Sequence, residues 1–167
     1  MTQTSDQPEI ITSKKHSSEG HAALRHGRVS MTGQIYHVST TTIGRCRLFD
    51  DFIVGCAAAR CFESSVSLGD AQMLAWVLMP DHVHWLIGLG EKITLDALVS
   101  RLKATSARNV NQAISRTGAV WARAYHDHAL RRDEDVASVA RYIVANPLRA
   151  GLVESVAHYP FWNAVFL

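Results

Sequence analysis

Cysteine is scarce in this sequence and long apolar runs are missing from it, and each absence excludes a class of protein. The three cysteines are odd in number and form no Cys-x-x-Cys pair, so we expect a reducing compartment in which they serve as small core residues. Apolar runs such as AWVLMP are far too short to span a bilayer, so no membrane segment is expected. The start of the chain carries no basic patch followed by an apolar core, which predicts no secretory signal and a cytoplasmic location.

What the sequence does contain is the composition of one globular domain. It has 167 residues, of which 47% are hydrophobic and 19% are charged. A chain of this length buries roughly two thirds of its unfolded surface in a single core. Residues 1–27 are polar with little apolar periodicity, so we expect a disordered or loosely docked tail there and a single domain over residues 28–167.

Positive charge is concentrated in one part of the chain. The formal net charge is only +2, yet residues 97–132 contain seven basic residues and one acid, a local charge of +6. Such a stretch is either a solvated face or a track for the phosphate backbone of a nucleic acid. The composition does not decide between these two interpretations.

Changes of hydrophobic period predict the order strand, helix, strand, strand, helix, strand, with one helix appended. The first expected elements are a strand over GQIYHVSTTT and a helix over DFIVGCAAARCFESSVSL, with Phe52, Cys56, Ala59 and Phe62 on one face of that helix. Two strands follow, at residues 71–78 and from His82, and then a helix from Thr94 to about Ile114. The last elements are an extended segment VWARAYHDHALR and a helix from Asp133 that stops at Pro147. This order is typical of an α+β fold, a ferredoxin-like antiparallel sheet with two helices on one face.

Two histidines alternate in the stretch MPDHVHWLIGLG. On a strand the side chains of His82 and His84 point to the same face, and they leave the backbone at positions roughly 6–7 Å apart. Two imidazoles held in this way suit a metal ion, because their nitrogens can meet at one point. A polar pair on the surface of a sheet is the alternative, and a third ligand is needed to choose.

A tyrosine and an asparagine lie one helical turn apart in RYIVANPLRAGLV. Tyr142 offers a phenol and Asn146 offers an amide oxygen, and their spacing of four residues puts both on one helical face. If that face lies across the histidine pair, the four side chains form one site. Tyr142 as a packing residue and Asn146 as a helix terminator before Pro147 are the alternatives.

The sequence resembles the single-tyrosine HUH transposase superfamily, and in particular the REP-associated, IS200-like tyrosine transposases. The resemblance runs from Tyr36 to about Trp162. Its motifs are YHVST, HVH in MPDHVHWLI, the series Lys103, Ser106 and Asn109, then Trp121, YHDHALR, and YIVANPLRAGLV.

The resemblance implies an HUH nuclease fold in which a C-terminal helix carries the nucleophile. Tyr142 matches that nucleophile, His82 and His84 match the histidine ligands, and Asn146 matches the third ligand of a divalent metal, Mg²⁺ or Mn²⁺. Relatives in the wider superfamily often carry Gln at the last position, which is longer by one methylene.

Other positions follow the family pattern less closely. Asp81 and Trp85 stand where the family often has Asn and an aliphatic residue. The resemblance places the second pair, His126 and His128, in a structural or DNA-facing segment. A second metal site formed with Asp127 is the alternative. The basic residues expected to contact DNA are Arg45, Arg101, Lys103, Arg108, Arg131 and Arg149.

The implied function is metal-dependent cleavage and strand transfer at single-stranded or hairpin DNA through a 5′-phosphotyrosine. One alternative is a catalytically silent protein that binds hairpin DNA, and another is a small metal-dependent hydrolase unrelated to DNA. The sequence leaves open whether the protein is a monomer or a homodimer.

Overall fold

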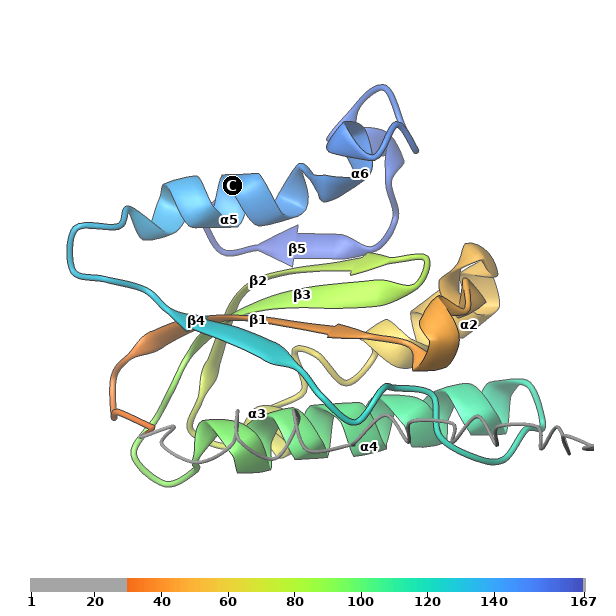
Figure 1. Ribbon diagram of the computed structural model, residues 1–167, viewed down its shortest axis with the longest axis horizontal. Coiled ribbons are helices and arrows are strands. Elements are labelled where there is room, and N and C mark those ends of the chain that lie inside the picture. The colour runs from red at the N-terminus through yellow and green to blue at the C-terminus, as the bar shows by residue number, and fades with distance from the viewer. Residues whose placement is uncertain (1–29, 167) are drawn as a thin grey trace, which may run out of the picture.

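The computed structural model describes residues 30–166, so the tail predicted at residues 1–27 lies outside the described part of the chain. Five antiparallel strands form one sheet in the order β4-β1-β3-β2-β5 (Figure 1). In chain order they are β1 (Ile35–Thr41), β2 (Gln72–Met79), β3 (His82–Gly88), β4 (His126–Ala129) and β5 (Trp162–Ala164). The first four reproduce the predicted strands, and the ferredoxin-like α+β sheet is confirmed.

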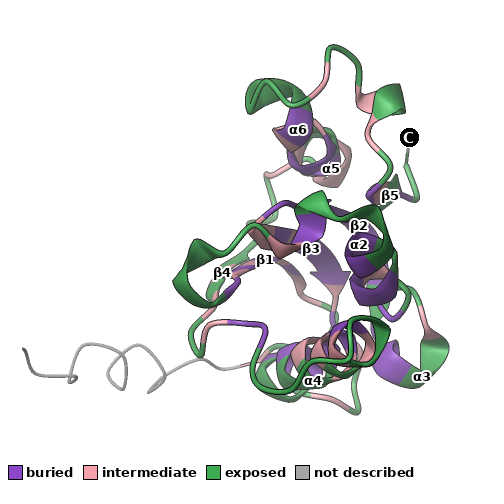
Figure 2. Cartoon of the chain, turned by 90° about the vertical axis from the view of Figure 1, so that its right-hand side faces the viewer, coloured by how far each residue is buried: buried purple, intermediate pink, exposed green. Residues whose placement is uncertain are grey.

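Helices cover both faces of the sheet (Figures 1 and 2). One face carries α2 (Phe52–Ala59), α3 (Ser65–Leu68) and α4 (Leu95–Ala113), and the other carries α5 (Val136–Val144) and α6 (Asn146–Arg149). Three short 3-10 helices lie in connections: η1 (Ile43–Arg45), η2 (Leu48–Asp50) and η3 (Val156–His158). Within residues 30–166 no helix has the length and apolar character needed to cross a membrane.

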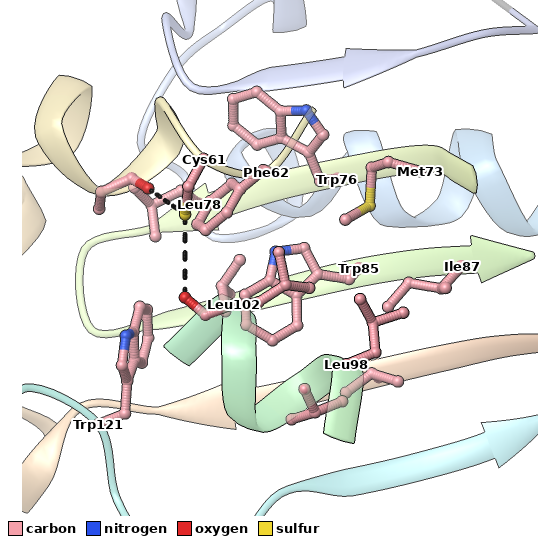
Figure 3. Close-up of a cluster of buried hydrophobic side chains, with 14 of the residues drawn as sticks. Cys61, Phe62, Met73, Trp76, Leu78, Trp85, Ile87, Leu98, Leu102 and Trp121 are labelled. Atoms are coloured by element: carbon pink, nitrogen blue, oxygen red, sulfur yellow. Dashed lines mark hydrogen bonds between the residues drawn. The ribbon is translucent and has the colours of Figure 1, made fainter. Parts of the chain in front are cut away.

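The larger core lies between the sheet and α4. Trp85 of β3 and Leu102 of α4 are both 0% exposed. The ring of Phe62 stands edge-on to Trp85 and also to Trp76, with centroids 5.3 Å apart in each pair (Figure 3). Because burying one large apolar side chain contributes about 1.5–3 kcal/mol, this cluster fixes the backbone of β3 firmly.

A smaller core holds α5 against the opposite face. Ile143 and Val144 of α5 pack with Leu86 of β3 and Val77 of β2, and all four are buried. Since side chains alternate along a strand, Leu86 lies on the same face as His82 and His84. We call this side of the sheet the histidine face, and α5 is packed over it.

The helix predicted from Asp51 to Leu68 is wrong in its extent and in its buried face. The Asp51 carboxylate caps α2 by accepting from the main-chain N–H groups of Ile53 and Val54 at 2.8 and 3.2 Å, but α2 ends at Ala59 and a turn separates it from α3. Phe52 is 61% exposed, and the buried side of α2 includes Val54, Ala57 and Ala58. The sequence FIVGCAAA has no polar residue, so its spacing cannot indicate which side is buried.

The predicted burial of the cysteines is right for one of three. Cys61 is buried, whereas Cys46 and Cys56 are exposed. Cys46 follows η1 in a surface turn, and Cys56 lies on the outward side of α2.

The remaining boundaries shift by a few residues. Thr94 caps α4 as predicted, its hydroxyl oxygen accepting from the N–H of Ala97 at 3.3 Å. Asp135 caps α5, which begins at Val136 and ends at Val144, while Pro147 lies inside α6. The fourth strand is shorter than expected, and β5 was not predicted, because three residues are too few to show a period of two.

Candidate active site

Strand β3 presents two imidazoles side by side on the histidine face. The ring centroids of His82 and His84 are 5.0 Å apart and their planes are inclined at 83°. In the ladder with β1, His82 lies opposite Thr41 and His84 lies opposite Ser39. The two imidazoles therefore share one face of the sheet, as alternation along a strand predicts.

His82 is held by the preceding residue. Its Nδ1 lies 2.6 Å from Oδ1 of Asp81, whose Oδ2 accepts from Arg45 Nη1 at 2.9 Å. Burial acts to raise the pKa of the Asp81 carboxyl, but the hydrogen bonds from His82 and Arg45 outweigh it and bring the pKa below its ordinary value. An ionised carboxylate only accepts hydrogen bonds, so Nδ1 of His82 is the donor, and in the neutral tautomer Nε2 carries the lone pair.

His84 is held by a residue from the neighbouring strand. Its Nδ1 lies 3.0 Å from Nε2 of His37 on β1. Burial, followed by electrostatic interactions with His37, His82 and Arg149, lowers the pKa of His84 to about 3. The pKa of His37 is also lowered, first by burial and then by the charge of His128. Both rings are therefore neutral at pH 7, and one donates to the other through N–H···N.

Tyr142 lies on α5, the helix that packs over the histidine face. Its side chain is 58% exposed, and none of residues 30–166 forms a hydrogen bond with its hydroxyl. The guanidinium of Arg149 stacks on its ring, with the central carbon 3.9 Å from the ring centroid. The charge of Arg149 also contributes, as the smallest of the causes, to the lowered pKa of His84.

Asn146 lies at the start of α6, and both ends of its amide have partners. Its Nδ2 donates to the carbonyl of Ile143 at 2.8 Å, and its Oδ1 accepts from Nη2 of Arg149 at 2.9 Å. Nη1 of Arg149 donates to the carbonyl of Tyr142 at 2.7 Å. The oxygen predicted as a third metal ligand is thus engaged by a guanidinium.

The predicted DNA-contacting cations are divided between the two sides of the sheet. Arg45 and Arg149 belong to the site described above, whereas Arg101, Lys103 and Arg108 lie on α4 across the sheet (Figure 1). Arg131 lies in the connection between β4 and α5. The structure therefore does not gather the six cations around Tyr142.

Two motif residues on α4, Lys103 and Ser106, form hydrogen bonds with the segment that precedes β4. Lys103 Nζ donates to the carbonyls of Ala122 and Arg123 at 2.7 and 3.1 Å. Ser106 Oγ accepts from Nε1 of Trp121 at 2.8 Å, and it donates to the carbonyl of Leu102 at 2.7 Å. These contacts give Lys103, Ser106 and Trp121 a structural role.

Three more histidines lie on the histidine face. His37 of β1 lies opposite His128 of β4, and Ser39 lies opposite both His84 and His126. Residues directly opposite each other in an antiparallel ladder share a face. Sequence reasoning missed His37, because its contact with His84 depends on the register of strands 47 residues apart.

The side chains present fit a divalent cation that is only partly enclosed by protein. His82 and His84 each engage Nδ1, and among the described residues no group bonds to either Nε2. Within residues 30–166 there is no cluster of three or more His, Cys, Asp or Glu suited to a metal. The donor set therefore offers two imidazole nitrogens and leaves the remaining positions for oxygen atoms of a substrate.

A ferredoxin-like sheet with paired histidines on one face and a tyrosine on a helix packed over it is the arrangement expected for the HUH superfamily that the sequence resembles. The chain belongs to one family within it: the model of the family described as "Transposase IS200 like" matches residues 30–146.

Individual relatives agree with this membership. The chain is 31% identical over 100 residues to a protein of Haemophilus influenzae assigned as a REP-associated tyrosine transposase, a match covering 54% of this chain and 57% of the relative. It is 28% identical over 89 residues to the REP-associated tyrosine transposase of Escherichia coli, covering 52% of this chain and 50% of the relative. The chain thus spans only about half the length of these two relatives.

Solved structures show the same fold. A REP-associated tyrosine transposase bound to a REP hairpin superposes with a TM-score of 0.61 at 21% identity, covering 81% of this chain and 79% of that one. A crystal structure from Deinococcus radiodurans, described as a transposase, superposes with a TM-score of 0.50 at 24% identity, covering 70% of this chain and 93% of that one.

Proposed function

We propose that this protein nicks and joins single-stranded DNA beside a hairpin, through a covalent bond between Tyr142 and a 5′ phosphate. The observation that carries the proposal is an exposed tyrosine on the helix packed over the histidine face. That face presents two imidazoles whose Nε2 atoms are free among the described residues. Membership of the IS200-like transposase family supports the reaction, and the hairpin bound by a structural neighbour supports the substrate.

In the forward reaction Oη of Tyr142 attacks the phosphorus of the scissile phosphodiester. A bond forms between Oη and phosphorus, and the bond from phosphorus to the 3′ oxygen breaks. The phenol proton passes to solvent, and the departing 3′ oxygen takes up a proton to become a hydroxyl. One phosphate ester replaces another, so a second 3′ hydroxyl can reverse the step and join a new strand.

His82 and His84 would hold a divalent cation, Mg²⁺ or Mn²⁺, through their Nε2 atoms. Asn146 would become a third ligand where Arg149 releases its Oδ1. When bound, the cation supplies Lewis-acid neutralisation of the charge that builds on the phosphate. Neutral nitrogen ligands with open positions suit a cation shared with phosphate oxygens.

The cations on the two sides of the sheet would serve different parts of the DNA. Arg45 and Arg149 border the site and would contact phosphates next to the cut. Arg101, Lys103 and Arg108 on α4, together with Arg131, would contact the DNA backbone farther from the cut. Lys103 would do so while its ammonium also donates to the protein main chain. Phosphate contacts of this kind set position and affinity without reading bases.

The experiment that tests the proposal is a denaturing gel of protein incubated with labelled hairpin-bearing single strands and Mn²⁺. Wild type should form a covalent adduct, and Tyr142→Phe should form none, because the attacking oxygen is gone while the ring remains. Tyr125→Phe is the matched control, since the Tyr125 hydroxyl contacts Asp96 on the α4 side of the sheet. Adduct from the Tyr142 variant would contradict the proposal.

A catalytically silent hairpin-binding protein is the second candidate. The engagement of Asn146 Oδ1 by Arg149 favours it, since that contact removes the predicted third ligand. Tight binding of the hairpin without any adduct, in Mg²⁺ or Mn²⁺, would support this candidate over the first.

A further inference from the structure

We propose that Asp81 and His37 are positioning residues, which orient His82 and His84 so that both present Nε2 to the metal. This inference rests on the proposed function, because it concerns the same cation. Neither residue would touch the cation itself. Each would act through Nδ1 of the imidazole beside it.

The first half of the arrangement is the chain Arg45, Asp81, His82. Asp81 Oδ2 is fixed by Arg45 at 2.9 Å, which leaves Oδ1 to accept from His82 Nδ1 at 2.6 Å. The main chain of Asp81 is also fixed, since its carbonyl accepts from the N–H of buried Thr42 at 2.8 Å. A carboxylate anchored in this way permits only the tautomer of His82 with hydrogen on Nδ1.

The second half is the pair His37 and His84. Their ring nitrogens are 3.0 Å apart, so one must donate and the other must accept. A metal on Nε2 of His84 requires hydrogen on Nδ1, which then donates to Nε2 of His37. His37 must in turn carry its own hydrogen on Nδ1. A fixed tautomer on His84 thus depends on an acceptor from the neighbouring strand.

Partners of this kind matter because metal-binding imidazoles need both the correct tautomer and the correct ring orientation. Removing such a partner typically weakens metal binding roughly ten- to hundred-fold. The competing interpretation is that these contacts only stabilise the surface of the sheet. In that case their loss would change thermal stability and leave metal affinity unaltered.

The first measurement needs no metal. Long-range ¹H–¹⁵N NMR spectra of the full chain report which nitrogen of each imidazole carries hydrogen. We expect hydrogen on Nδ1 in both His82 and His84 at neutral pH. Hydrogen on Nε2 of either ring in the wild type would overturn the proposal for that ring.

The second measurement is the affinity for Mn²⁺ by calorimetric titration of the full chain. Asp81→Ala and His37→Leu should each weaken binding roughly ten- to hundred-fold. Asp81→Asn and His37→Gln keep an acceptor oxygen, so they should recover part of that loss and remain informative if the first two variants fail to fold. Wild-type affinity in all four variants would overturn the proposal.

A matched control is available on the same face. Glu134 pairs with His128 at 3.0 Å, so Glu134→Ala removes the carboxylate partner of a histidine that is not a predicted ligand. Its Mn²⁺ affinity should equal that of wild type, and an equal loss there would overturn the site-specific role. Replacing His82 and His84 by Ala tests the proposed function separately, because undiminished Mn²⁺ binding in that variant would remove the metal site itself.

Discussion

The guanidinium of Arg149 lies over the ring of Tyr142, with its central carbon 3.9 Å from the ring centroid. The same group donates to the Tyr142 carbonyl and to Oδ1 of Asn146. A single side chain on α6 therefore fixes the orientation of the predicted nucleophile and engages the predicted third ligand.

Replacing Arg149 by Ala should slow adduct formation roughly ten- to hundred-fold, which corresponds to losing one or two charge-assisted contacts. Arg149→Lys should recover only part of the rate. An ammonium keeps the positive charge, but it lacks the planar surface that contacts the Tyr142 ring and cannot donate two hydrogen bonds in the geometry of a guanidinium. Single-turnover assays at saturating DNA measure the rate. A wild-type rate in Arg149→Ala would show that the stacked cation has no part in the chemistry.

Removing the paired imidazoles should separate cleavage from binding. His82→Ala combined with His84→Ala should abolish metal-dependent cleavage and leave hairpin affinity within a few-fold of wild type, because phosphate contacts supply most of that affinity. Asn146→Gln should retain more activity than Asn146→Ala, since it keeps an amide oxygen. Gel-shift and cleavage assays on the same preparations give both quantities, and normal cleavage by the double variant would exclude the histidine site.

Cations on opposite sides of the sheet should behave differently. Arg108→Ala should weaken hairpin binding and reduce the slope of log K against log salt by about one, while the rate at saturating DNA stays unchanged. Arg45→Ala should lower that rate as well, because Arg45 anchors Asp81 beside His82. A flat salt dependence in the wild type would count against nucleic acid as the substrate.

The helix that carries Tyr142 should weaken in acid through its N-terminal cap. Hydrogen bonds from the Ser138 side chain, and then from the N–H groups of Ser138 and Ala137, lower the pKa of Asp135 despite some desolvation. A carboxyl with a lowered pKa in the folded state contributes stability above its unfolded value of 3.8, and that contribution is lost as the pH falls through the folded value. Asp135→Ala should therefore lower Tm at pH 7 and have little effect near pH 2.

The neighbouring acid provides the control for this measurement. Asp133 lies two residues before the cap, so Asp133→Ala should leave Tm at pH 7 nearly unchanged. Hydrogen exchange should also show faster opening of α5 in the Asp135 variant than in the Asp133 variant. Equal Tm values for the two variants would contradict the capping role.

Alternation and capping signals predicted most of the fold, because they depend on neighbouring residues only. The strand with His82 and His84 and the helix capped by Thr94 were found in this way. The break after Ala59 was missed because α2 is apolar on every side. The three residues of β5 show no usable period, and their place is set by pairing with β2.

The site was predicted less completely than the fold. The sequence indicates that His82 and His84 share a face, which is a local property of one strand. The sequence does not indicate that His37 contacts His84, because that contact depends on the register between two strands. It also does not indicate that Arg149 donates to the amide oxygen of Asn146, because that contact depends on the direction of α6 after Ala145. Contacts between distant residues require the packed structure.

The separation of Tyr142 and Arg108 by the thickness of the sheet has a consequence for the substrate. Any DNA that touches both must pass around an edge of the sheet, and the length of that path is a fixed property of the protein. The protein would therefore cut at a fixed number of nucleotides from the DNA segment that it binds. Lengthening the strand between hairpin and cut should then move the cleaved phosphate along the sequence rather than follow the original bases.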